Sequence, residues 1–336
     1  MPLPKFFQMR RRALSLAALF FPLLLPAIPA KAAESGTYAL IFENDLFYRT
    51  DRDYTNGIEL NWSPSRESSA ARPSLFTDML PAFFPRGDLR ASYSLGQMMF
   101  TPEDTKAFNP PLTQRPYAGY LYGALALTSA RDGREDQLRI LLGMIGPASL
   151  AQDSQDFVHQ LRGFALPQGW HTQLRDEPGL VLSYRHSQEL ADFALREEKI
   201  FDIAANYGGA VGNVFDYAEA GAAARLGFNL PADSGPPQID PARPGSRIYQ
   251  PQADFGAYIF SGFQGRAVVR NLFLDGNSFQ PSRSVPKENF VGEFSAGGAL
   301  AFEKFRISFV HVFRSQEYRA QKGWDQFGTI SLSVNF

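Results

Sequence analysis

The sequence contains no cysteine, so no disulfide bond can hold this fold together. Histidine is also scarce, with only four in 336 residues. No G-x-S-x-G segment occurs, which is the motif that presents a nucleophilic serine in α/β-hydrolases. No basic block suggests binding to nucleic acid. These absences exclude a disulfide-stapled module and the common serine-esterase motif, and they leave nucleic acid without support as a partner.

The N-terminus has the three parts of a secretory signal peptide. Basic residues at Lys5 and 10–12 precede an apolar run over 13–28, and a small-x-small cleavage pattern follows at 30–32. The run is short and interrupted by proline, which argues against a membrane anchor helix. We therefore expect residues 1–32 to be removed. The remaining chain carries 28 Lys+Arg against 34 Asp+Glu, a formal net charge of −6.

No segment after residue 32 is long and apolar enough for a spanning helix, yet the chain is rich in aromatic residues, with 30 Phe and 13 Tyr. The C-terminus alternates strictly, with apolar Ile330, Leu332, Val334 and Phe336 separated by polar residues. Such a strand suits a barrel wall that has lipid on one face and a polar lumen on the other. A soluble sandwich can also end this way, but the signal peptide favours the barrel.

Other segments repeat this alternation and predict an all-β, transmembrane, antiparallel up-and-down β-barrel over residues 33–336. We expect twelve strands, near 37–44, 54–63, 91–100, 117–129, 136–146, 179–188, 195–207, 215–229, 253–274, 289–302, 304–316 and 326–336. Both termini then lie in the periplasm. The odd-numbered connections face outward, near 45–53, 101–116, 147–178, 208–214, 275–288 and 317–325. Two periplasmic connections, 64–90 and 230–252, are longer than such turns usually are.

The third outer connection, 147–178, is long enough to hold a short helix. Ser149 to Gln152 matches a capping box, and Gly163 suits the C-terminal end. An apolar stripe follows at helical spacing: Leu150, Phe157 and Leu161. Gln155 and His159 are four residues apart, so they project from one face of this helix. We expect that face to lean over the barrel rim with its polar groups turned inward.

His159 is the candidate general base, because imidazole titrates near neutrality and can take a proton from water. A lone histidine is weak support for a base, and a partly exposed helix histidine is the simpler interpretation. Asn44 and Asp45 end the first predicted strand and offer the oxygen ligands that Ca²⁺ prefers. Asn and Asp are also common in turns, so a structural role stays open. If the protein is a hydrolase, water activated by histidine and a metal ion is the most economical scheme.

Taken in order and spacing, a set of short motifs in the first half resembles the outer-membrane lipid A deacylase family, the LpxR type. The motifs are Glu43-Asn44-Asp45, Asp53-Tyr54-Thr55-Asn56-Gly57, Arg115-Pro116-Tyr117-Ala118-Gly119, Ile145-Gly146-Pro147, Gln155 with His159, Gly169-Trp170, Gln173-Leu174 and Glu177-Pro178. The second half matches mainly as barrel strands.

The resemblance implies Ca²⁺-dependent hydrolysis of the 3′-linked acyloxyacyl ester of lipid A by a His-activated water. It implies that His159 is the base, with these residues around it: Gln155, Asn44, Thr55 and Lys106. Asn44 and Asp45 would bind the metal. Some members carry a functional glutamate six residues after the histidine, where this chain has Ala165. Glu177 or a carbonyl would then replace it.

Two other functions remain open at the level of the sequence. A passive channel or structural barrel would explain the small residues of 217–229 and the polar lumen positions. An outer-membrane phospholipase would share the logic of water, base and calcium. The resemblance favours lipopolysaccharide in the outer leaflet as the partner, and a monomer with its site on the extracellular side.

Overall fold

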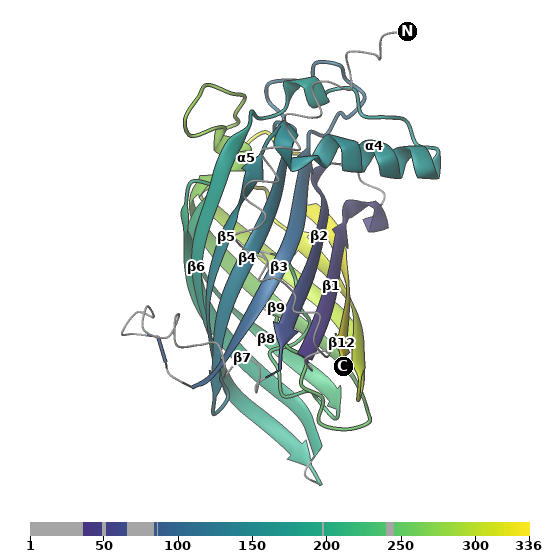
Figure 1. The fold of residues 1–336 in the computed structure, drawn as a ribbon, viewed down its shortest axis with the longest axis vertical. Helices are drawn as coiled ribbons and strands as arrows, with labels where there is room; N and C mark the ends of the chain where they lie inside the picture. The colour runs from purple at the N-terminus through teal and green to yellow at the C-terminus, as the bar shows by residue number, and fades with distance from the viewer. Residues whose placement is uncertain (1–35, 49–51, 66–83, 86, 197, 240–244) are drawn as a thin grey trace, which may run out of the picture.

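The computed structural model describes residues 36–48, 52–65, 84–85, 87–196, 198–239 and 245–336 (Figure 1). The expected signal peptide and most of the 64–90 connection lie outside these residues. Twelve antiparallel strands form one closed barrel, in which each strand pairs with its neighbours in sequence and β1 pairs with β12. The strands are β1 (Gly36–Asn44), β2 (Asp53–Pro64), β3 (Asp88–Thr101), β4 (Ala118–Arg131), β5 (Arg134–Ile145), β6 (Glu177–Leu195), β7 (Glu198–Gly212), β8 (Phe215–Phe228), β9 (Phe255–Asn271), β10 (Phe290–Phe302), β11 (Phe305–Arg314) and β12 (Asp325–Asn335).

The predicted fold class is thus confirmed, including the number of strands and their order. The stretch 253–274 forms one strand, β9, as expected, and not two. Short helices sit in the connections at one end of the barrel, at the top of Figure 1. They are η2 (Asp45–Tyr48), η3 (Pro147–Ser149), α4 (Ala151–Arg162), η4 (Trp170–Thr172) and α5 (Leu272–Asp275). Among the described residues, no helix is long and apolar enough to cross a membrane.

The two ends of the barrel differ, and we name them for their contents. The helix rim consists of the described connection residues 45–48, 52, 102–117, 146–176, 213–214, 272–289 and 315–324. The terminal rim is the opposite end of the barrel, where β1 begins and β12 ends. Strands alternate in direction, so all the outward connections predicted from the sequence meet at the helix rim.

The wall has an apolar outer face and a polar inner face, because successive side chains of a strand point to opposite sides. In β1, Tyr38, Leu40 and Phe42 are exposed, whereas Ile41 and Glu43 are buried. The same alternation gives an apolar outer surface along β2, β11 and β12. Aromatic pairs lie at its edges, such as Tyr38 stacked on Phe336 with centroids 4.9 Å apart. This is the surface that a lipid bilayer requires of a barrel.

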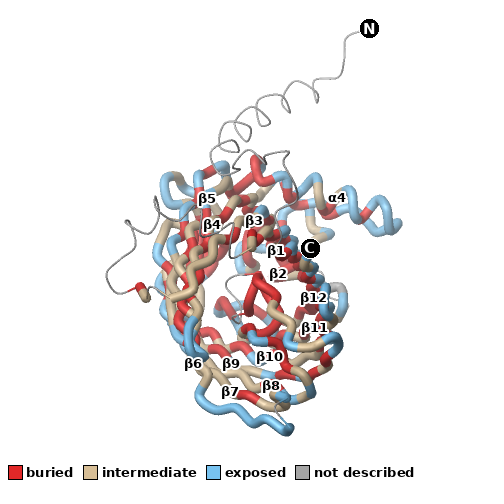
Figure 2. Tube along the Cα trace, turned by 60° about the horizontal axis from the view of Figure 1, so that its bottom comes forward, coloured by how far each residue is buried: buried red, intermediate tan, exposed pale blue. Residues whose placement is uncertain are grey.

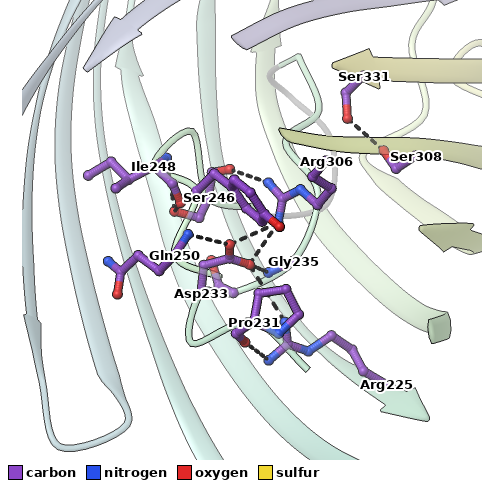
Figure 3. Close-up of polar contacts among 12 residues, drawn as sticks. Arg225, Pro231, Asp233, Gly235, Ser246, Ile248, Gln250, Arg306, Ser308 and Ser331 are labelled. Carbon is purple, nitrogen blue, oxygen red and sulfur yellow. Dashed lines mark hydrogen bonds and ion pairs between the residues drawn. The ribbon is translucent and has the colours of Figure 1, made fainter. Parts of the chain in front are cut away.

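The long connection between β8 and β9 folds back into the lumen, where its described residues, 230–239 and 245–252, form what we call the lumen segment (Figure 3). Asp233 accepts hydrogen bonds from Arg306 of β11 at 2.8 and 2.9 Å. Arg247 donates to Glu59 of β2 at 2.6 Å. The Ile239 N–H donates to Glu43 of β1 at 3.0 Å, close to the helix rim. The segment therefore contacts strands on several sides of the barrel.

Candidate active site

The helix α4 starts in a way that the sequence did not predict. Its N-cap is Leu150, in the left-handed region at φ 59°, and no side chain caps it. The Ser149 hydroxyl instead donates to the Gly146 carbonyl at 2.6 Å and so closes the preceding η3 turn. The expected capping box is therefore wrong, because Ser149 belongs to a separate turn. The predicted end is confirmed, since Gly163 adopts φ 69° and its N–H bonds the carbonyls of the last turn.

The start of α4 rests on the outer surface of the barrel wall. In β4, Gly119 alternates with the lumen-facing Tyr120 and Tyr122, so it points outward. A Cβ on Gly119 would lie 2.3 Å from the Cβ of Ala151, and only glycine allows so close an approach. The outward Gln97 of β3 adds a hydrogen bond to the Ser149 carbonyl at 2.7 Å. These contacts hold α4 on the lipid side of the wall.

An outward-facing cluster fixes the face of α4 that carries Gln155. Met99 of β3, Tyr117, Ala151 and Trp170 form this small buried core, which is separate from the lumen. The Trp170 indole N–H donates to Gln155 Oε1 at 2.7 Å. Because only the oxygen of the amide can accept from the indole N–H, this bond holds the Gln155 side chain in one orientation. Gln155 is buried, at 4% exposure.

His159 lies one turn further along the same face and is also buried, at 5% exposure. Its Nδ1 is 2.7 Å from the carbonyl oxygen of Ala165. A carbonyl oxygen can only accept, so Nδ1 carries the proton of the neutral ring and Nε2 is the basic nitrogen. The Phe164 ring contacts the imidazole edge-on at 5.7 Å. The backbone at position 165 thus orients the histidine, although the side chain there is only a methyl group.

Asn44, Asp45 and Thr55 lie at the ends of β1 and β2 on this rim. Asn44 has the outward parity of Leu40 and Phe42. Thr55 is the extra residue of an irregularity in the β2–β3 pairing, and its hydroxyl lies 2.6 Å from that of Thr101. Neighbouring strands are about 4.8 Å apart, so the end of β1 and the outward row of β3 are separated by roughly 10 Å. Asn44, Asp45 and Thr55 therefore lie at the same rim as α4, which contacts β3 and β4.

The oxygen atoms at the end of β1 suit a hard cation such as Ca²⁺. Asp45 is fully buried and accepts a hydrogen bond from the Arg52 N–H at 2.7 Å. Asn44 and Thr55 add neutral oxygen atoms. Among the described residues, no group of three or more His, Asp or Glu side chains gathers around one point. An ion held here would draw on the Asp45 carboxylate together with neutral oxygen atoms.

The two remaining predicted site residues, Glu177 and Lys106, lie at the start of β6 and in the second connection. Glu177 shares the parity of the buried Val181, so it faces the lumen side of β6, whereas Asn44 faces outward. Its carboxylate accepts hydrogen bonds from Asn213, Asn277 and the Ser278 N–H at 2.8–3.0 Å, which ties three connections together. Lys106 is exposed in the second connection, where its backbone N–H donates to Asp104. The neighbouring Thr105 carbonyl accepts hydrogen bonds from the Tyr117 hydroxyl at 3.2 Å and from the Gln168 N–H at 2.9 Å, so this connection packs beside the Trp170 cluster.

Sequence reasoning assigned no role to Trp170, Thr101 or Arg115. Trp170 and Arg115 belong to motifs noted above. The sequence therefore marked these positions, but it did not show which residues they contact. Arg115 is buried at the helix rim and pairs with Glu317 at 3.2 Å. Burial opposes ionisation of Glu317, but Arg314 and Arg115 outweigh it and lower the pKa of this carboxyl. This pair fastens the second connection to the sixth.

Comparisons with known proteins agree with this architecture. The family model described as "Outer membrane protein LpxR" matches residues 15–336. LpxR from Salmonella typhimurium superimposes with a TM-score of 0.74 at 19% identity, covering 89% of this chain and 100% of that one. The β domain of the Bordetella autotransporter BrkA covers 90% of this chain and 100% of its own at 10% identity, with a TM-score of only 0.42. A search of curated protein sequences finds no match.

Proposed function

The chain belongs to the LpxR family of outer membrane proteins, and we propose that it removes an acyl group from lipid A by hydrolysing the 3′-linked acyloxyacyl ester. His159 acts as general base in this proposal: its Nε2 takes a proton from water, and the water oxygen attacks the ester carbonyl. The Ala165 carbonyl holds the ring tautomer that this requires. Gln155, fixed by Trp170, aligns the water.

Ca²⁺ is the cofactor that we propose, with Asp45 and Asn44 as its protein ligands. When bound, it would supply positive charge for the oxyanion that develops on the ester oxygen. The buried carboxylate of Asp45 and the neutral oxygens of Asn44 and Thr55 support this choice. Lys106 stays a prediction from the resemblance, and so does Glu177, whose carboxylate is engaged by Asn213, Asn277 and Ser278.

One observation carries the proposal: Gln155 is held by Trp170 of the outward-facing cluster, and His159 is buried one turn further along the same helix, outside the lumen. A lipid can reach such a site by lateral movement within the leaflet, while a soluble substrate gains nothing from it. We propose further that the helix rim faces the cell exterior and that the protein acts as a monomer. A maleimide that cannot cross membranes should then label Arg162→Cys on intact cells and spare Asp132→Cys at the terminal rim. The native chain has no competing thiol.

The decisive experiment is mass spectrometry of lipid A from cells that express the protein or its variants. His159→Ala should give no deacylated lipid A, whereas Gln160→Ala, an exposed neighbour on the same helix, should act like the wild type. Heat-modifiable migration on gels would report that both barrels are folded. Deacylation by a folded His159→Ala protein would remove His159 from the mechanism.

Two alternatives make different predictions. The lumen segment argues against a passive channel, because buried ion pairs hold it inside the barrel. Steady ion conductance in planar bilayers, with lipid A unchanged, would support the channel instead. A phospholipase would use the same base and metal. Phospholipid and lipid A offered together in one vesicle would separate these two esterases.

A further inference from the structure

The helix α4 has an apolar edge that is largely exposed. Phe157 and Leu161 are 66% and 76% exposed, and Val158 is 42% exposed. The buried face of α4 is instead the one with Ala151, Gln155 and His159. A helix at the surface of a soluble protein has the reverse arrangement, with its apolar residues against the core.

The side chains of α4 fall into three stripes. At 3.6 residues per turn, these stripes lie about 120° apart around the helix axis. The stripes are the docked one (Ala151, Gln155, His159), the apolar one (Leu150, Phe157, Leu161) and the polar one (Gln152, Asp156, Gln160). A helix lying flat at a membrane surface needs this pattern: one side on the protein, one in lipid and one in water. The apolar character continues past the helix in the exposed Phe164 and Leu166.

The surroundings of α4 identify what covers the apolar stripe. The helix is roughly 18 Å long, and it projects sideways from the helix rim near the ends of β1 to β3 in both views (Figures 1 and 2). It leaves the wall at the outward-facing Gly119. Beside it, Phe47 of η2 packs edge-on against Phe42 and Phe309, at 6.3 and 5.7 Å, and extends the lipid-facing band up to the rim. The apolar band of the barrel thus reaches the rim from which α4 projects, so both meet the same leaflet.

We propose that the Leu150–Phe157–Leu161 edge of α4 inserts among the acyl chains of the leaflet that surrounds the helix rim. The polar stripe, with Asp156 and Gln160, then faces water. Insertion fixes the depth of His159 at the boundary between headgroups and chains, where ester bonds of membrane lipids lie. This inference rests on the proposed function in one respect only, namely that the leaflet around the helix rim is the outer leaflet. The insertion itself follows from the exposure and spacing of these side chains.

Single-cysteine labelling tests the insertion directly, because the native chain has no thiol of its own. Leu161→Cys and, as matched control, Gln160→Cys would each carry a nitrobenzoxadiazole fluorophore in phosphatidylcholine vesicles. Doxyl-labelled phosphatidylcholine should quench the probe at 161 and spare the one at 160. Aqueous iodide should give the opposite order. These vesicles contain no lipid A, so the result does not depend on catalysis, and loss of the His159 mechanism would leave it intact.

Three outcomes would overturn the proposal. Equal quenching of both probes by iodide would mean that the apolar edge stays in water. Protection of the probe at 161 from both quenchers would mean that a protein surface, such as a second copy, covers it. Equal doxyl quenching at 160 and 161 would mean that the whole helix is submerged, which contradicts the three-stripe orientation.

Activity gives an independent readout of the same surface. Phe157→Ser/Leu161→Ser changes only exposed side chains, so the barrel should fold as before. The variant should lose activity on lipid A in vesicles and keep it on lipid A dispersed in detergent, where depth in a bilayer has no meaning. Gln152→Ser/Gln160→Ser is the matched control and should behave as wild type in both. An unchanged ratio between the two substrates for the first variant would contradict the role of insertion.

Discussion

Gly119 is the position at which the barrel wall and α4 come closest, so one methyl group there tests the geometry of the whole site. In Gly119→Ala, the new Cβ would lie 2.3 Å from the Cβ of Ala151 and 2.2 Å from Ser149 Oγ. Carbon atoms in contact are about 3.5–4 Å apart, so the start of α4 must move outward by roughly 1.5 Å. A displacement of about 1 Å of a catalytic group costs on the order of a hundredfold in rate. We expect a loss of that size.

The assay is the initial rate of lipid A deacylation in mixed micelles, followed by mass spectrometry, with heat-modifiable migration as the measure of folding. Gly298→Ala is the matched control, because its Cβ would meet Tyr258 O at an ordinary 3.6 Å. It should fold and act as wild type. A folded Gly119→Ala protein with an undiminished rate would refute the reasoning that contact with the wall positions His159.

Three further predictions concern single interactions. Trp170→Phe removes the indole N–H that orients the Gln155 amide. A misaligned amide that raises the barrier by about 1.4 kcal/mol lowers the rate about tenfold, and an unaltered rate in a folded variant would exclude Gln155 from aligning the water. Excess EDTA should stop deacylation and added Ca²⁺ should restore it, while full turnover in the chelator would exclude the metal. Asp233→Ala leaves Arg306 buried without its carboxylate, at a cost of about 3–5 kcal/mol. We expect a lower unfolding temperature and a higher conductance in planar bilayers. If both stay unchanged, other contacts hold the lumen segment in place.

The strands are predictable from the sequence because lipid and lumen make opposite demands on alternate residues. In β12, Ile330 and Leu332 must face lipid and Ser331 must face inward, and a shift of one residue would reverse every position. The pattern therefore fixes both the strand and its register. It also fixes which connections share a rim, and hence that Thr55 and His159 lie at the same end.

The start of α4 is less predictable, because local signals compete there. Ser149 satisfies the sequence pattern of a capping box, yet its hydroxyl bonds Gly146 inside an adjacent turn. What decides between the two is the close fit of Ser149 and Ala151 against Gly119, thirty residues earlier in the chain. Such a contact depends on tertiary structure, which a local pattern does not contain.

The lumen segment lay beyond prediction for the same reason. Its excess length was visible, but length alone does not say that a connection turns inward. The buried pairs Arg247–Glu59 and Arg306–Asp233 join residues far apart in the chain. The alternation along β6 could have predicted the direction of Glu177. It has the same parity as the buried Val181, so it points to the lumen side, whereas Asn44 points outward.

A catalytic histidine on the outside of a barrel has a kinetic consequence, if the substrate is the leaflet lipid that we propose. Encounters then take place in two dimensions, and the relevant concentration is the number of substrate molecules per unit area of leaflet. Both products of the cleavage also stay in the bilayer beside the protein. The speed of remodelling is therefore governed by lateral diffusion and by the crowding of neighbouring lipids, and not by any concentration in the surrounding medium.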